Sequence, residues 1–157
     1  MTMLRGLIGV LVALAISVGF VQFLERILGD ALTGHALASM DEYALVLNSP
    51  AVVAVRVVIS SLMALLGGYV CAKLAETDEM RYTLIAVIFR IVAIAGGNTA
   101  GYIPPTPVWA LALILTVSTA AMLAGGGIRA AAAATTRTMP ANRGDASPQR
   151  NTTGDTA

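Results

Sequence analysis

Charged residues are scarce in this chain. They make up 12% of its 157 residues, about half the usual share in a soluble domain. Most of these charges fall between or beyond long apolar runs, and apolar residues make up 57% of the chain. Too few charged side chains are present to build the polar faces that keep a protein dissolved. The composition therefore excludes an ordinary soluble domain and predicts a membrane protein whose first partner is the lipid bilayer.

Residues that carry catalysis or bind metals are also few. The single cysteine, Cys71, excludes an intramolecular disulfide, and the single histidine, His35, argues against a metal site. No phosphate-binding loop, GxSxG, HExxH or dinucleotide motif is present. The chain also lacks the basic patch with interleaved aromatics that is typical of nucleic-acid binding. We therefore expect no enzyme, catalytic residue, cofactor, metal or nucleic-acid partner.

Four apolar stretches are long enough to cross a bilayer, whose hydrocarbon core of about 30 Å takes about 20 helical residues. The stretches are continuous rather than alternating, which favours helices over a membrane barrel. The predicted fold is all-α, a four-helix transmembrane bundle in residues 1–134. Its helices cover about residues 4–27, 51–74, 81–102 and 108–128. Whether the third helix is continuous past Gly97 stays open.

Basic residues border the predicted helices on one side of the membrane only. They precede the first helix, flank the loop between the second and third, and follow the fourth, whereas the loop of residues 29–50 carries acids alone. Because cytoplasmic loops are enriched in Lys and Arg, both termini are predicted to be cytoplasmic. The residues are Arg5, Lys73, Arg81, Arg129, Arg137, Arg143 and Arg150.

Two further segments lie outside the predicted spans. The second half of the loop of residues 29–50 predicts a short surface helix, with Met40, Tyr43, Ala44 and Leu47 toward the lipid. Residues 135–157 are almost devoid of apolar side chains and predict a disordered cytoplasmic tail. A cleaved signal peptide is not expected, because the first apolar run exceeds the 7–15 residues that such peptides use.

Two arginines, Arg56 and Arg90, fall inside predicted spans, where a charge is a functional hypothesis by default. Arg56 shares a helical face with Ser60. Glu25 lies at a comparable depth on the first helix, so a structural Glu25–Arg56 pair is expected. Glu25, Arg56, Ser60 and Arg90 form the candidate intramembrane polar site.

Arg90 has no acid at a matching depth, so a structural role requires another arrangement. It is expected to snorkel toward its nearer surface and to hydrogen-bond a hydroxyl group. The functional alternative is an anion path or a docking site for a partner's carboxylate. The possible hydroxyl partners are Ser60, Ser61, Thr116 and Thr119.

Small residues punctuate the predicted helices and allow helix backbones to approach closely. Those of the second and fourth helices predict that these two helices pack together, with a hinge as the alternative. Those of the third helix share the face of Arg90, while Ile85, Ile88 and Val92 suit lipid. The predicted helix-packing residues are Gly67, Gly68, Ala86, Ala93, Gly97, Gly125, Gly126 and Gly127.

The order of these parts resembles small bacterial four-helix inner-membrane proteins of uncharacterised function. The shared parts are a basic start, a loop of about 20 residues, two glycine-rich helix ends and the segment 104–109, within residues 4–130. The resemblance implies a fold and a location but no activity. Small multidrug transporters also have four helices but depend on a glutamate in the middle of the first, which is uncharged here over residues 6–24.

Together these features predict a non-enzymatic structural or accessory protein that packs with other membrane proteins or with itself as a homo-oligomer. The alternative is a small transporter or channel component that uses Arg56 and Arg90 for an anionic solute.

Overall fold

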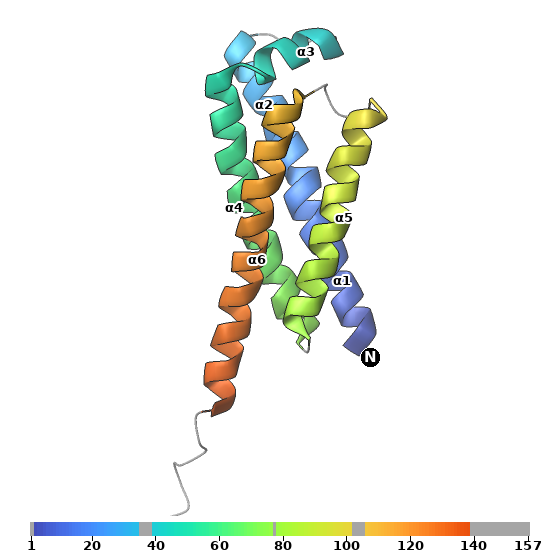
Figure 1. The fold of residues 1–157 in the computed structure, drawn as a ribbon, viewed down its shortest axis with the longest axis vertical. Coiled ribbons are helices and arrows are strands. Elements are labelled where there is room, and N and C mark those ends of the chain that lie inside the picture. The colour runs from blue at the N-terminus through green and yellow to red at the C-terminus, as the bar shows by residue number, and fades with distance from the viewer. Residues whose placement is uncertain (1, 35–38, 77, 102–105, 139–157) are drawn as a thin grey trace, which may run out of the picture.

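The computed structural model describes residues 2–34, 39–76, 78–101 and 106–138, and nearly all of them are helical. The first rod is formed by α1 (Thr2–Leu14), the π-helical segment η1 (Ala15–Phe20) and α2 (Val21–Thr33). A short helix, α3 (Met40–Leu47), crosses one end of the bundle, which we call the α3 end (Figure 1). The remaining rods are α4 (Pro50–Ala75), α5 (Glu79–Thr99) and α6 (Val108–Thr138).

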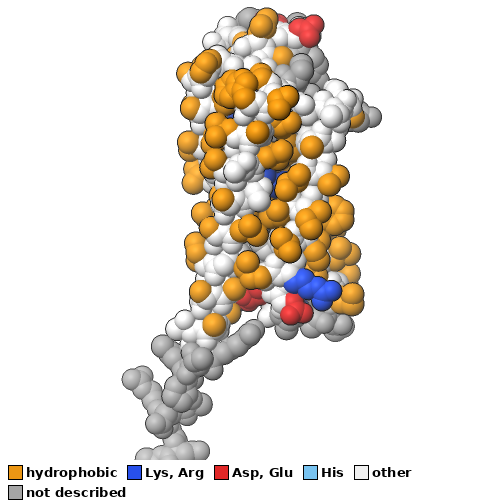
Figure 2. Space-filling view, viewed as in Figure 1, with side chains coloured by type: hydrophobic (Ala, Val, Ile, Leu, Met, Phe, Trp, Pro, Cys, Tyr) orange, Lys and Arg blue, Asp and Glu red, His pale blue; other side chains and the backbone are white. Residues whose placement is uncertain are grey.

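The rods have the length and the surface of membrane-spanning helices. Four helical stretches are long and apolar enough to cross a membrane: Met3–Thr33, Pro50–Ala75, Glu79–Thr99 and Val108–Thr136. Apolar side chains cover the side of the molecule in Figure 2, and acidic and basic ones gather near its ends. Exposed apolar surface of this extent is unfavourable in water and suits lipid. The predicted all-α fold with four helices able to span a membrane is confirmed, whereas its orientation stays a prediction.

Helix bounds differ from the predicted ones at three places. The first rod reaches Thr33 and ends at Gly34, whose φ of 72° is typical of a helix-terminating glycine. The α5 helix is continuous past Gly97 but ends at Thr99 rather than at residue 102. The α6 helix continues to Thr138, so residues 135–138 are helical and not disordered. Alanines dominate residues 130–134, and alanine has the highest helix propensity, which outweighs the polar composition that follows. Predictions for His35 and residues 139–157 lie outside the described residues.

Glycines bring α4 and α6 into backbone contact. A side chain on Gly68 would overlap the carbonyl of Met122, and one on Gly125 would overlap the backbone of Leu65. The two helices therefore interlock, each through a glycine that faces the other's backbone. This contact is the close packing of the second and fourth helices that the sequence predicts.

Two other glycines of this predicted set reach different neighbours, and a third packs against nothing. A Cβ on Gly67 would lie 3.2 Å from the carbonyl oxygen of Ala13 on α1, and a Cβ on Gly126 would lie 2.7 Å from the Thr83 side chain on α5. Gly127 corrects the prediction, because a Cβ there would meet no atom within 4 Å. It follows Gly126 on the helix and faces away from α4.

The half of the bundle away from α3 holds an apolar core, to which α1, α4, α5 and α6 all contribute. Cys71 is fully buried in it, as expected for a packing residue. Ile85 is half-buried and packs against this core, which corrects its assignment to lipid. The buried members are Val10, Ala13, Ala64, Cys71, Ala86, Val87 and Met122.

The burial of α5 changes at Arg90. Ala86, Val87 and Arg90 are buried, whereas no residue of 91–99 is. Ala93 is exposed, so it does not pack within this bundle as predicted, and Gly97 is half-buried. Figure 1 shows why: toward the α3 end, α5 stands to one side of α4 and α6.

The α3 helix is positioned by its own sequence. The Ser39 hydroxyl accepts a hydrogen bond from the Glu42 amide at 3.2 Å, which caps the helix. The helix forms as predicted, but Ala44 and Leu47 are buried in protein instead of facing lipid. The reason is that α3 lies over the ends of α2 and α4. The side chains of Met40 and Tyr43 lie outside the described part of the chain.

Candidate functional site

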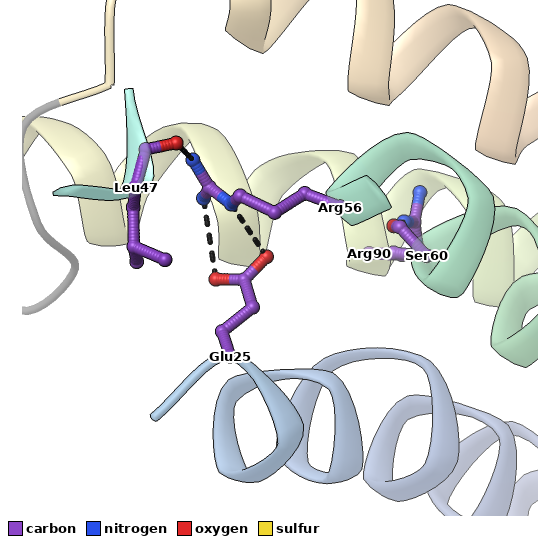
Figure 3. A network of polar contacts seen from close by, with 5 residues as sticks. All are labelled: Glu25, Leu47, Arg56, Ser60 and Arg90. Carbon is purple, nitrogen blue, oxygen red and sulfur yellow. Dashed lines mark hydrogen bonds and ion pairs between the residues drawn. The ribbon is translucent and has the colours of Figure 1, made fainter. Parts of the chain in front are cut away.

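Glu25 and Arg56 form a buried ion pair near the α3 end (Figure 3). Arg56 Nε donates to Glu25 Oε1 at 2.9 Å, and Arg56 Nη2 donates to Glu25 Oε2 at 3.2 Å. Each side chain is 4% exposed. The planar guanidinium matches both carboxylate oxygens, the strongest geometry such a pair adopts. The structure thus contains the ion pair that depth matching predicts.

The third guanidinium nitrogen of Arg56 reaches the surface helix. Arg56 Nη1 donates to the backbone carbonyl of Leu47 at 3.4 Å. Carbonyls in the last turn of a helix have no partner within that helix, so the end of α3 offers a free acceptor. Arg56 therefore joins α2, α3 and α4 through one side chain and ties the end of α3 to the bundle.

Arg90 lies deeper in the bundle and does not snorkel. It is 1% exposed, and its Nη2 donates to the Ser60 hydroxyl at 2.9 Å. Its Nε and Nη1 are buried and have no hydrogen-bond partner among the described residues. The snorkelling prediction is wrong because α4 places Ser60 within reach inside the bundle, one turn beyond Arg56. Of the hydroxyls expected near Arg90, Ser60 is the one that accepts its hydrogen bond.

Ser17 is a residue that the sequence does not predict for the site, yet it lies in the same polar region as Glu25, Arg56 and Ser60. It lies in η1, is 1% exposed, and its hydroxyl has no partner within the described part of the chain. A π-helical turn inside an α-helix is rare and often marks a functional site. One signal for it exists in the sequence: Ser17 and Gln22 carry the only polar side chains in the otherwise apolar residues 6–24.

A small cavity lies beside these groups and is lined by Ser17, Glu25, Arg56 and Ser60, but not by Arg90. Its volume is about 30 Å³, and a cavity holds a water-sized group at roughly 10–15 Å³. Polar side chains line it from the middle of the bundle to the α3 end. There the Asn98 side-chain oxygen accepts a hydrogen bond from the Thr106 amide at 3.1 Å. Its polar lining consists of Ser17, Gln22, Glu25, Arg56, Ser60, Asn98 and Thr106, and its apolar lining of Val18, Val21, Ile94, Leu111 and Ile114.

The charges of this region do not cancel. Glu25 neutralises Arg56, whereas no acid forms an ion pair with Arg90 among the described residues. The buried cluster of Glu25, Arg56 and Arg90 therefore carries one excess positive charge. Such an arrangement can fix the helices relative to one another and can attract a negative group.

Charged groups at the two ends bear on orientation. Arg26 is exposed on α2, close to the α3 end, and the predicted distribution of basic residues did not include it. At the opposite end, exposed Arg5 pairs with Glu76 in the turn between α4 and α5. One basic residue at the α3 end reduces the asymmetry without reversing it. Within the described ranges, no group of His, Cys, Asp and Glu side chains is arranged to hold a metal ion.

No family model, curated protein or solved structure matches this chain. The resemblance to small bacterial four-helix inner-membrane proteins therefore stays a prediction. The chemistry of the site rests on its own residues. Glu25, Arg56 and two buried serines line the narrow cavity, and Arg90 lies behind Ser60, to which it donates.

Proposed function

We propose that this is a non-enzymatic membrane protein with a structural or accessory role, which packs beside another membrane protein or a second copy of itself. One observation carries the proposal: the bundle covers the half of α5 nearest to α3 only in part. Residues 91–99 include no fully buried residue, whereas one face of the same helix is buried as far as Arg90.

The composition of this uncovered segment favours a protein neighbour over lipid alone. Ala93 and Gly96 are exposed, and a Cβ on Gly96 would meet no atom within 4 Å. In a bilayer, apolar side chains gain little by leaving lipid, so helices associate where small residues let their backbones approach. Small exposed residues on α5 fit such an approach.

The interior of the bundle supports the same role. The backbone contact of α4 and α6 at Gly68 and Gly125 leaves no room for a solute between these two helices, and the cavity near α3, about 30 Å³, is too small for a transport path across the bundle. Each guanidinium nitrogen of Arg56 already donates a hydrogen bond to Glu25 or Leu47. These features suit a rigid bundle whose exposed α5 surface binds a neighbouring protein.

Cysteine crosslinking in native membranes tests the proposal. In a Cys71→Ala background, Ala93→Cys and Gly96→Cys should crosslink to a neighbour under mild oxidation or with a short bifunctional reagent. Val58→Cys and Leu62→Cys are matched controls, because both residues are exposed on α4 at 58% and 59% but are large and suit lipid. These controls should stay uncrosslinked.

Purification in mild detergent supplies the second measurement. A dimer or a copurifying membrane protein is expected for the wild-type chain. A strictly monomeric protein that crosslinks at neither α5 position and copurifies with nothing would contradict the proposal.

A second candidate is a small transporter or channel component for an anionic solute. The observation that favours it is Arg90, which is buried with two unpartnered nitrogens and bonded to a serine of the polar cavity. Anion flux into vesicles that contain the purified protein is the measurement. Arg90→Gln should abolish the flux, and unchanged flux would remove Arg90 from this account.

A further inference from the structure

We propose that the polar cavity between η1, α2, α4, α5 and α6 binds one small monatomic anion such as chloride, held by the hydroxyls of Ser17 and Ser60 near the charge of Arg90. This binding site goes beyond the accessory role and does not depend on it. The argument rests on donors, charge and size.

Two serine hydroxyls, from Ser17 and Ser60, line the cavity. The Ser17 hydroxyl is buried and has no partner among the residues that the structure describes. The Ser60 oxygen accepts a hydrogen bond from Arg90, so its own proton is directed elsewhere, and Ser60 lines the same cavity. Ser17 comes from η1 and Ser60 from α4, so an acceptor between them would satisfy both.

The sign of the charge favours an anion. Both oxygens of Glu25 accept from Arg56, which leaves Arg90 as the excess charge of the cluster. A buried ion without a counter-ion is costly, and intramembrane charges usually pair. Arg90 is 1% exposed, so the carboxylate of a neighbouring protein cannot reach it, whereas a small diffusible anion near Ser60 lies close to its charge.

Size decides which anion fits. A volume of about 30 Å³ admits two or three water-sized groups at most, since each takes roughly 10–15 Å³. A halide is comparable with such a group, whereas sulfate, phosphate and gluconate are larger. Water is the competing occupant, and the test must separate water from chloride.

Thermal unfolding of the purified full-length protein in detergent provides the test. Sodium chloride is replaced by sodium gluconate at constant ionic strength. A ligand that binds only the folded state stabilises it increasingly with concentration. The unfolding midpoint should therefore rise with chloride concentration along a curve that defines one dissociation constant, and bromide should act likewise. Gluconate should produce no rise.

Variants connect the response to the site. Ser17→Ala and Ser60→Ala each remove one hydrogen bond to a charged ligand and should weaken chloride binding about tenfold. Arg90→Gln should abolish the response. Arg26→Gln is the matched control, because Arg26 is an exposed arginine near the same end of the bundle, and it should bind chloride as the wild type does.

Ser17→Ala keeps the test decisive if Arg90→Gln fails to fold, because the Ser17 hydroxyl makes no hydrogen bond within the described residues. A chloride response that is equal in wild type, Ser17→Ala and Ser60→Ala would overturn the site. So would an equal rise in gluconate, or no dependence on chloride at all, which is the result expected if only water occupies the cavity. None of these outcomes alters the crosslinking at α5 that tests the accessory role.

Discussion

At the scale of single residues, the Glu25–Arg56 pair is the most consequential contact. Both side chains are 4% exposed, and the carboxylate is bound by two nitrogens. A buried ion pair is weak evidence for net stabilisation, because desolvation offsets the attraction. Removal of one partner is strongly destabilising, since it leaves the other charge buried and uncompensated. The pair should therefore show its importance in single variants more than in the net stability of the wild type.

Single and double substitutions should separate these effects. Glu25→Leu and Arg56→Met should each lower the free energy of unfolding by about 3 kcal/mol, because each strands one buried charge. The double variant should recover most of that loss, since both charges are gone. Reversible unfolding in mixed detergent micelles measures all four proteins. Additive losses in the double variant would show that the two side chains are not coupled.

At the scale of helices, glycine position decides how α4 and α6 meet. Gly125 faces the backbone of Leu65, whereas Gly127, two residues later, faces open space. The same substitution at the two positions therefore has opposite consequences. At Gly125 a methyl group forces the helices apart, and at Gly127 it adds only helix propensity.

A pair of alanine variants measures this difference. Gly125→Ala should destabilise the protein by about 2 kcal/mol, in the range of overpacked sites. Gly127→Ala should be neutral or stabilising by up to about 1 kcal/mol, the propensity difference between glycine and alanine. Thermal unfolding of both variants under one condition checks the order. Equal effects would mean that the α4–α6 contact does not depend on Gly125.

Helix-scale features also show what the sequence predicts and what it misses. The four spans follow from continuous apolar runs, and the Glu25–Arg56 pair follows from matching depths along two helices. The burial of Arg90 does not follow from the sequence, because its position on α5 is compatible both with snorkelling and with a buried hydrogen bond to Ser60. The π-helical turn that carries Ser17 has no sequence signature. Ala93 is misjudged because periodicity places it on the Arg90 face but cannot show that α5 stands away from its neighbours there.

At the scale of the whole molecule, orientation in the membrane is the property that charge predicts. The end with residue 2 and the α4–α5 turn carries Arg5, Lys73 and Arg81, whereas Arg26 lies nearer the α3 end. Since Lys and Arg near span ends are retained in the cytoplasm, both termini should be cytoplasmic.

Reporter fusions measure this orientation directly. A green fluorescent protein fused after residue 157 should fluoresce, and alkaline phosphatase at the same point should be inactive. Phosphatase inserted in the loop of residues 35–38 should be active. The opposite pattern would reverse the topology and place the α3 end in the cytoplasm.

The length of α6 has a consequence for whatever follows it. The helix has 31 residues, which corresponds to about 46 Å at 1.5 Å per residue. The hydrocarbon layer is only about 30 Å thick. Figure 1 shows the surplus at one end, where α6 reaches well past the other helices. The last turns of α6 thus act as a spacer that carries Thr138 beyond the hydrocarbon layer. A molecule that recognises the end of this helix would meet it outside the lipid tails, without entering the membrane interior.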